Sequence, residues 1–276
     1  MCPKQVGRSV PLKAMDTFEY IKTLAKFRDE MDDKPSWVRI TTITMMAKGV
    51  LGAVDARMIR KVFKAIGGSI MVYPKGSKKG FEWKIRPSKR GSNFYNCISI
   101  GYVDCYSTKA VKLFSNGSIQ VAGCSNVLDC KRVVAQLAVV LPLILNKSLD
   151  IRYDLFKIVM INTNFSLNKT LNLYSVIRSL KRNDIFEVNY DPGSYSAVTV
   201  KFKPKPEMKR VTVAIFSTGN IIITGAETLM EIAHAYKMIN ENIGSECRIK
   251  ETDIKQDFGV TMGASFEEWL RVLNVV

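Results

Sequence analysis

The sequence predicts an α+β fold in which helices cover one face of a curved antiparallel sheet. An internal repeat is the first observation: VAIFSTGNIIITG at 213–225 has a partner about 102 residues earlier, VKLFSNGSIQVAG at 111–123. Both stretches alternate with the period of two that is typical of strands, around a turn that contains glycine. Each then continues into a segment with apolar residues at helical spacing. One structural unit therefore occurs twice along the chain.

Each unit is expected to run strand, helix, three strands and a long helix, which suits a sheet covered on one face. The matched hairpin positions are Val111 and Val213, Phe114 and Phe216, Ser115 and Ser217, Gly117 and Gly219, Ile119 and Ile221, and Gly123 and Gly225. The other expected elements are strands at 38–46 and 156–165, helices at 59–66 and 173–180, strands at 94–102 and 195–202, and helices at 130–141 and 229–243.

The repeats divide the chain into four parts. These are a basic N-terminal extension at 1–35, a first repeat at 36–147, a second repeat at 148–245 and a C-terminal extension at 246–276. Each extension is expected to carry one amphipathic helix, the first from about Thr17 to Met31 and the second in SFEEWLRVLNVV at the C-terminus. The apolar face of that second helix packs either on its own domain or on a partner.

The first repeat carries a basic insertion at 73–92, with seven Lys or Arg residues and one Glu. Glycine and proline near its edges favour a loop or a small hairpin. Two interpretations stay open, a flap that contacts phosphate groups and a solvated surface loop.

The net charge of +16 and the isoelectric point near 9.6 favour a polyanionic partner, nucleic acid first and an anionic membrane surface second. The six cysteines are scattered without a C-x-x-C pair, which argues against a zinc site or a disulfide framework. No catalytic pair, phosphate-binding loop, cofactor motif or metal cluster is evident, and the lone His234 falls off the apolar face of its helix. We therefore expect a binding protein, neither secreted nor membrane-spanning, rather than an enzyme.

Strand alternation separates two faces of the expected sheet. One face of the second hairpin carries Val213, Ile215, Ile221 and Ile223, which belong against helices; the other carries Ala214, Phe216, Ile222 and Thr224. The first hairpin divides in the same way, with Lys112, Phe114, Gln120 and Ala122 on its second face. A partly apolar sheet rimmed by lysines is an interaction surface, and a DNA minor groove fits it.

Two segments, IFSTGNIIITGAET and YDPGSYSAVTVKFKP, carry a family resemblance in the correct order. They resemble the TATA-box-binding protein family, and the likeness covers roughly 36–245. The divergence is similar to that of family relatives in large DNA viruses. The resemblance implies a two-repeat saddle with helices on the convex face. It also implies a transcription initiation factor that grips the DNA minor groove and wedges aromatic rings between base steps.

The resemblance also implies roles for individual residues. The expected wedges are Phe94, Phe114, Tyr195 and Phe216. Thr224 matches a family residue that contacts base edges, and Asn162, Asn164 and Gln120 are expected to make further base-edge contacts in place of family residues that this chain lacks. Lys201 matches a basic strand position of the family, and Arg39, Lys112 and Lys203 are expected to supply the remaining positive charge to the DNA backbone. The chain departs from the family pattern at Ser118 and Asn220, where a hairpin lysine is expected, and at Ala122, Ser125, Met160 and Glu227.

Three functions remain as alternatives. The first is a transcription initiation factor whose partners are AT-rich double-stranded DNA and other initiation factors or RNA polymerase subunits, in the nucleus or a cytoplasmic viral factory, or packaged in a virion. The second is a degenerate scaffold for a transcription or virion assembly, which the lost hairpin lysines favour. The third is a nucleic-acid-binding accessory to a nuclease or glycosylase. No cofactor and no membrane partner are expected.

Overall fold

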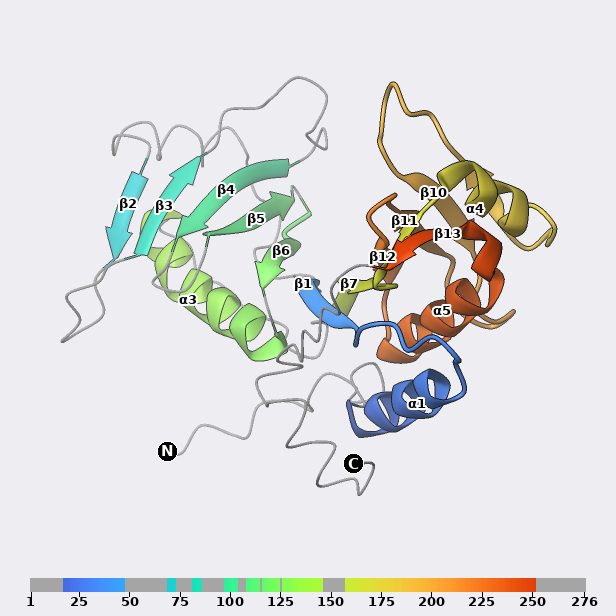
Figure 1. Cartoon of the computed structure of the whole chain (residues 1–276). Coiled ribbons are helices and arrows are strands. Elements are labelled where there is room, and N and C mark those ends of the chain that lie inside the picture. The colour runs from blue at the N-terminus through green and yellow to red at the C-terminus, as the bar shows by residue number, and fades with distance from the viewer. Residues whose placement is uncertain are drawn as a thin grey trace. The chain divides into compact units, whose positions relative to one another are not determined.

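The computed structural model describes residues 17–47, 69–72, 81–85, 97–103, 108–114, 116–124, 126–145 and 157–251 (Figure 1). The chain forms two compact units, each of which is described by itself. Unit 1 comprises 1–10 and 42–158, and unit 2 comprises 11–41 and 159–276.

The strands of unit 1 pair antiparallel in the order β2-β3-β4-β5-β6-β1. Their bounds are β1 (Arg39–Ala47), β2 (Ser69–Val72), β3 (Phe81–Ile85), β4 (Cys97–Val103), β5 (Thr108–Phe114) and β6 (Ile119–Cys124). Strand β3 lies inside the basic insertion expected at 73–92. This part of the insertion is therefore a strand of the sheet, paired with β2 on one side and β4 on the other.

Helix α3 (Val127–Leu145) covers one face of this sheet. Alternate residues of β5 and β6, among them Val111, Leu113 and Val121, are fully or almost fully buried, as are Val133 and Leu137 of the helix. Burial of such β-branched and leucine side chains stabilises each by about 1.5–3 kcal/mol.

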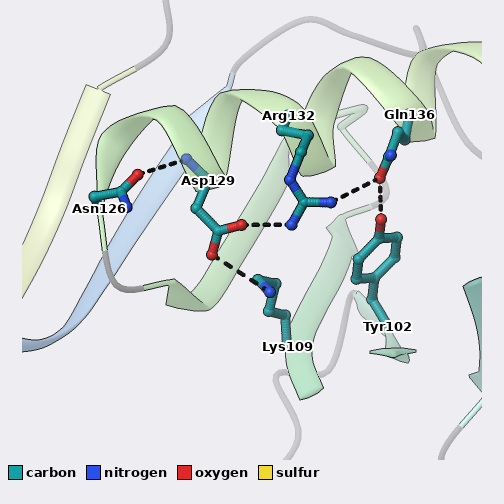
Figure 2. Close-up of polar contacts among 6 residues, drawn as sticks. All are labelled: Tyr102, Lys109, Asn126, Asp129, Arg132 and Gln136. Atoms are coloured by element: carbon teal, nitrogen blue, oxygen red, sulfur yellow. Dashed lines mark hydrogen bonds and ion pairs between the residues drawn. The ribbon is translucent and has the colours of Figure 1, made fainter. Parts of the chain in front are cut away.

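A polar cluster lies under the N-terminal half of α3 (Figure 2). The ammonium group of Lys109 is completely buried and lies 3.4 Å from the carboxylate of Asp129, which also pairs with Arg132. Tyr102 donates a hydrogen bond to Gln136, and Asn126 caps the helix by accepting the backbone N–H of Asp129 at 2.8 Å. Paired in this way, the buried charge of Lys109 is tolerated.

In unit 2 the strands pair antiparallel in the order β7-β12-β11-β10-β9. Their bounds are β7 (Lys157–Ser166), β9 (Glu187–Asn189), β10 (Val198–Phe202), β11 (Val211–Ile215) and β12 (Asn220–Ala226). The first residues of β1 lie beside β7, because the hydroxyl of Thr41 donates to the carbonyl of Asn162 at 3.0 Å.

Two helices of the second repeat, α4 (Leu173–Leu180) and α5 (Leu229–Asn242), provide apolar side chains for the core of unit 2. The ring of Tyr236 from α5 packs edge-on against Phe165 of β7, with ring centroids 4.7 Å apart. Phe165 is paired with Ile221, so the buried face of β7 and β12 is the face toward α5. Burial raises the pKa of the Tyr236 hydroxyl, which donates to the carbonyl of Ser36.

Both flanks contribute to unit 2. Helix α1 (Thr17–Asp29) buries Tyr20, Ile21, Leu24 and Ala25, and the ring of Phe27 lies 5.2 Å from that of His234 on α5. Strand β13 (Arg248–Glu251) pairs with β8 (Lys169–Leu171). Asp33 forms ion pairs with Lys169 and Arg248, so it links the N-terminal segment to this small sheet.

The α+β class predicted from the sequence is confirmed, with antiparallel sheets and helices over one face. The helix expected to end at Met31 ends at Asp29. The helix expected at 59–66 and the one expected near the C-terminus lie outside the described residues. Among the described residues, no helix is long and apolar enough to cross a membrane.

Candidate nucleic-acid interface

The candidate site in unit 2 is the sheet face that points away from α5, which we call the far face. Along β11 and β12, residues that point toward α5, such as Val213 and Ile223, have no exposed surface, whereas Ala214 and Ile222 are half-buried. The far face also carries Asn162 and Asn164 of β7 and Thr199 and Lys201 of β10. The alternation inferred from the sequence thus leaves apolar and small polar side chains accessible on one face.

Two of the expected wedges, Tyr195 and Phe216, contact each other. Their ring centroids lie 5.8 Å apart with an interplanar angle of 77°, an edge-to-face arrangement. Tyr195 is 47% exposed although it is large and aromatic. Phe216 is half-buried, so both rings of this aromatic pair keep surface that is available for contact with a ligand.

The β11–β12 hairpin fixes the position of Phe216. Its N–H donates to the carbonyl of Asn220 at 3.0 Å, and its carbonyl accepts from Gly219 at 2.9 Å. Gly219 has a φ of +79°, and a Cβ at this position would overlap the carbonyl oxygen of Lys169. Glycine is therefore required for this turn, which holds Phe216 at the end of the strand.

Unit 1 repeats this hairpin. Phe114 is half-buried, donates its N–H to Ser118 at 2.9 Å and accepts from Gly117, whose φ is +80°. The fourth expected wedge, Phe94, lies outside the described residues.

The residues expected at base edges fall in both units. On the far face of unit 2, Asn164 is exposed and opposite Ile222, Asn162 is half-buried, and the hydroxyl of Thr224 donates to the carbonyl of Thr212 at 3.3 Å. Gln120 of unit 1 is half-buried and opposite Lys112. The structure therefore places Asn162, Asn164 and Thr224 on one surface, and Gln120 beside the backbone candidate Lys112.

The basic candidates of unit 2 differ in their surroundings. Arg39 and Lys203 are exposed. The ammonium of Lys201 lies 3.9 Å from Glu187, which also pairs with Arg210. Sequence reasoning did not identify Glu187, because a three-residue edge strand such as β9 carries no clear periodic signal. This carboxylate reduces the positive charge that Lys201 can offer to a phosphate group.

A cavity of about 420 Å³ lies beside Phe216 at this end of the far face. Its lining includes Trp37, Arg39, Asn164 and Asn220. Sequence reasoning treated Asn220 only as a position where the family pattern has a lysine, and it did not identify Trp37. The aromatic residues before β1 carried no pattern that would have assigned them to this site.

Comparisons with known proteins find similarity to one family. Residues 155–245 match the family model of transcription factor TFIID, or TATA-binding protein. A TATA-box-binding protein-like protein of Acanthamoeba polyphaga mimivirus is 28% identical over 185 residues, which cover 57% of this chain and 49% of the relative. The match thus spans about half the length of that relative.

Two cellular proteins are also similar. A TATA-box-binding protein of Thermoplasma acidophilum is 27% identical over 137 residues, covering 49% of this chain and 68% of that protein. The solved structure of Methanococcus jannaschii TBP aligns with 75% of this chain and 97% of its own, at 15% identity and a TM-score of 0.48.

Proposed function

We propose that the chain is a divergent member of the TATA-binding protein family and a DNA-binding transcription factor that uses the far face of unit 2 and the equivalent face of unit 1. The match of 155–245 to the family model and the similarity to the mimivirus relative support this proposal. The observation that carries the proposal is the edge-to-face contact of the exposed Tyr195 with the half-buried Phe216 at the end of a partly apolar sheet face. Rings in this position insert between base steps of the minor groove, and Asn162, Asn164 and Thr224 contact base edges.

The net charge of +16 supports this proposal, since contacts between cations and phosphates dominate affinity for DNA. Arg39, Lys112, Lys201 and Lys203 are the proposed backbone contacts. AT-rich duplexes are the proposed targets because the similar proteins are named as TATA-box-binding, and the minor groove allows A·T pairs to be distinguished from G·C pairs. The proposal includes no catalytic step and no cofactor.

The proposed protein partners are other initiation factors or RNA polymerase subunits, bound through helices and loops rather than through the far face. The mimivirus relative supports a viral setting, with action in the nucleus or a viral factory of an infected cell.

A fluorescent AT-rich duplex and a GC-rich duplex, titrated at two salt concentrations, test the proposal. Phe216→Ala is expected to weaken binding to the AT-rich duplex about tenfold, because one stacked ring contributes about 1–3 kcal/mol. Phe18→Ala removes a ring that is 50% exposed on α1 and serves as the matched control. Equal and weak binding of both duplexes by wild type and Phe216→Ala would contradict the wedge.

That contradicting result would favour the second candidate, a scaffold without sequence-specific DNA binding. The ion pairs of Glu187 with Lys201 and Arg210 support this alternative, because they reduce the charge available to phosphates.

A further inference from the structure

The cavity beside Phe216 has a chemistry that differs from the rest of the far face. Residues from three parts of unit 2 line it: the entry to β1, the end of β7 and the β11–β12 hairpin. Its volume of about 420 Å³ lies within the range of small-molecule sites, roughly 300–1,000 Å³. It is therefore large enough to hold a planar ring system and not only a side chain or a water molecule.

Two side-chain amides line this cavity. Asn164 is exposed at the far face of β7, and Asn220 is half-buried at the start of β12. Within the part of the chain that the structure describes, neither amide makes a side-chain hydrogen bond. Each offers one carbonyl acceptor and two N–H donors. An apolar ligand would leave these groups unsatisfied as it excluded water, so the occupant must itself carry donors and acceptors.

The same cavity has aromatic lining. Phe216 is half-buried, and Trp37 is 9% exposed with the guanidinium of Arg28 4.6 Å from its ring centroid. A phosphate group would prefer several cations, but Arg39 is the one cationic residue among those that line the cavity in the described residues. Aromatic surface combined with neutral amides matches a nucleobase, which stacks through its faces and forms hydrogen bonds at its edges.

We propose that this cavity binds one unstacked nucleobase, next to the base step that Phe216 opens. The proposal rests on the proposed function, because it needs DNA on the far face. Asn164 and Asn220 form hydrogen bonds with the edge of the base, and the ring of Phe216 contacts its face. Extruding a base costs a few kcal/mol and costs least where the base is already unpaired. The protein is therefore expected to prefer DNA that carries an unpaired base at the wedge position.

The test compares three AT-rich duplexes that differ at one position: fully paired, with one bulged adenine, and with one bulged abasic site. The two bulges give the DNA similar flexibility, but only the adenine bulge offers a base. Wild type is expected to bind the adenine bulge about tenfold more tightly than the abasic bulge. The double variant Asn164→Ala, Asn220→Ala is expected to lose this difference, so that it binds the adenine bulge and the abasic bulge with equal affinity.

Asn189→Ala, an exposed asparagine on the edge strand β9 outside the cavity, is the matched control and should keep the difference. The base pocket is overturned if wild type binds both bulges equally, or if the double variant keeps the preference. If binding of the paired duplex depends on Phe216 but wild type shows no preference for the adenine bulge, the base pocket is overturned and the proposed function stands. If wild type binds none of the three duplexes, both fail. If Phe216→Ala binds the paired duplex as wild type does while the adenine preference still depends on the two asparagines, the wedge fails and the pocket stands.

Discussion

The two units satisfy a buried carboxylate at the same repeat position in different ways. Asp129 and Glu231 are each the third residue of the last helix of their repeat. In unit 1 the partners of Asp129 are side-chain cations, the buried ammonium of Lys109 at 3.4 Å and the guanidinium of Arg132. In unit 2, Glu231 accepts backbone N–H groups from Lys209, Glu227 and Thr228 at 2.9, 2.7 and 3.1 Å.

The strand residue equivalent to Lys109 explains this difference. It is Val211 in unit 2, which is fully buried and offers no charge. A buried lysine on a strand is thus accommodated only where a carboxylate faces it, whereas a capping glutamate is satisfied by the backbone of its own helix end and a neighbouring loop. Both repeats therefore have an acidic residue at this position, but its partners are side-chain cations in unit 1 and backbone N–H groups in unit 2.

The sheet faces that point away from the helices also differ between the two units. The cross-strand pair Lys112 and Gln120 of unit 1 corresponds to Ala214 and Ile222 of unit 2. At the neighbouring pair the polar residues are in unit 2 instead: unit 1 has Ala110 and Ala122, and unit 2 has Thr212 and Thr224. We expect unit 1 to contribute charge to a bound duplex near its strand centres, and unit 2 to contribute more apolar contact.

The largest expected effect is the loss of stability on replacing Lys109. Lys109→Met leaves Asp129 with one partner fewer in a site where its side chain is only 12% exposed. Breaking a buried pair in this way should lower the free energy of unfolding by about 3 kcal/mol. Urea denaturation measures it, with Lys131→Met on the outer side of α3 as the control. Adding Asp129→Asn to Lys109→Met should recover part of the loss. If the two single Lys→Met variants lose equal stability, the buried pair does not have the role assigned to it.

Glu231→Gln is expected to have a smaller effect in unit 2. The amide group that replaces one carboxylate oxygen cannot accept a hydrogen bond, so one or two of the three backbone N–H groups lose their acceptor. The expected cost is about 1–2 kcal/mol. Glu241→Gln changes an exposed i,i+4 pair with Lys237 and should cost only a few tenths of a kcal/mol by the same measurement. A loss for Glu231→Gln as large as that for Lys109→Met would remove the distinction between the two units.

Sequence reasoning identified the features with strong periodicity. Both hairpins and the helix at 229–243 were predicted because their alternation and helical spacing extend over many residues. The pairing of β8 with β13 was missed, since strands of three and four residues with a distant partner carry no local signal. The ion pair of Glu187 with Lys201 was missed for the same reason. The burial of Lys109 was missed because only its three-dimensional neighbour Asp129 makes a buried lysine favourable.

The comparison of the sheet faces leads to a prediction on salt dependence. If Lys112 contacts a phosphate, Lys112→Ala should reduce the slope of log K against log salt concentration by about 1. Lys201→Ala should reduce it by less than Lys203→Ala does, because Glu187 lies 3.9 Å from the ammonium of Lys201 in the free protein. Fluorescence titration over a salt series measures all three slopes, and Lys22→Ala on α1 is the control. Equal reductions for Lys203 and Lys201 would show that Glu187 does not limit Lys201.

The smallest expected effect concerns the position occupied by Arg132 in unit 1 and His234 in unit 2. Arg132 stays charged beside Asp129, whereas partial burial and then nearby Lys205 and Lys237 lower the pKa of His234, with Glu207 acting in the opposite direction. A histidine whose folded pKa lies below its unfolded value of about 6.5 stabilises the fold above that pH and loses this contribution as the pH falls. His234→Gln should therefore reduce the loss of stability between about pH 7 and pH 5, as followed by thermal unfolding across that range. The backbone amide of Phe27, whose ring lies 5.2 Å from that of His234, offers a second measurement. In wild type its protection from hydrogen exchange should be greater at high pH than at low pH, and in His234→Gln this difference should disappear. The same pH dependence in wild type and His234→Gln would mean that other groups, and not this helix position, control the acid response of unit 2.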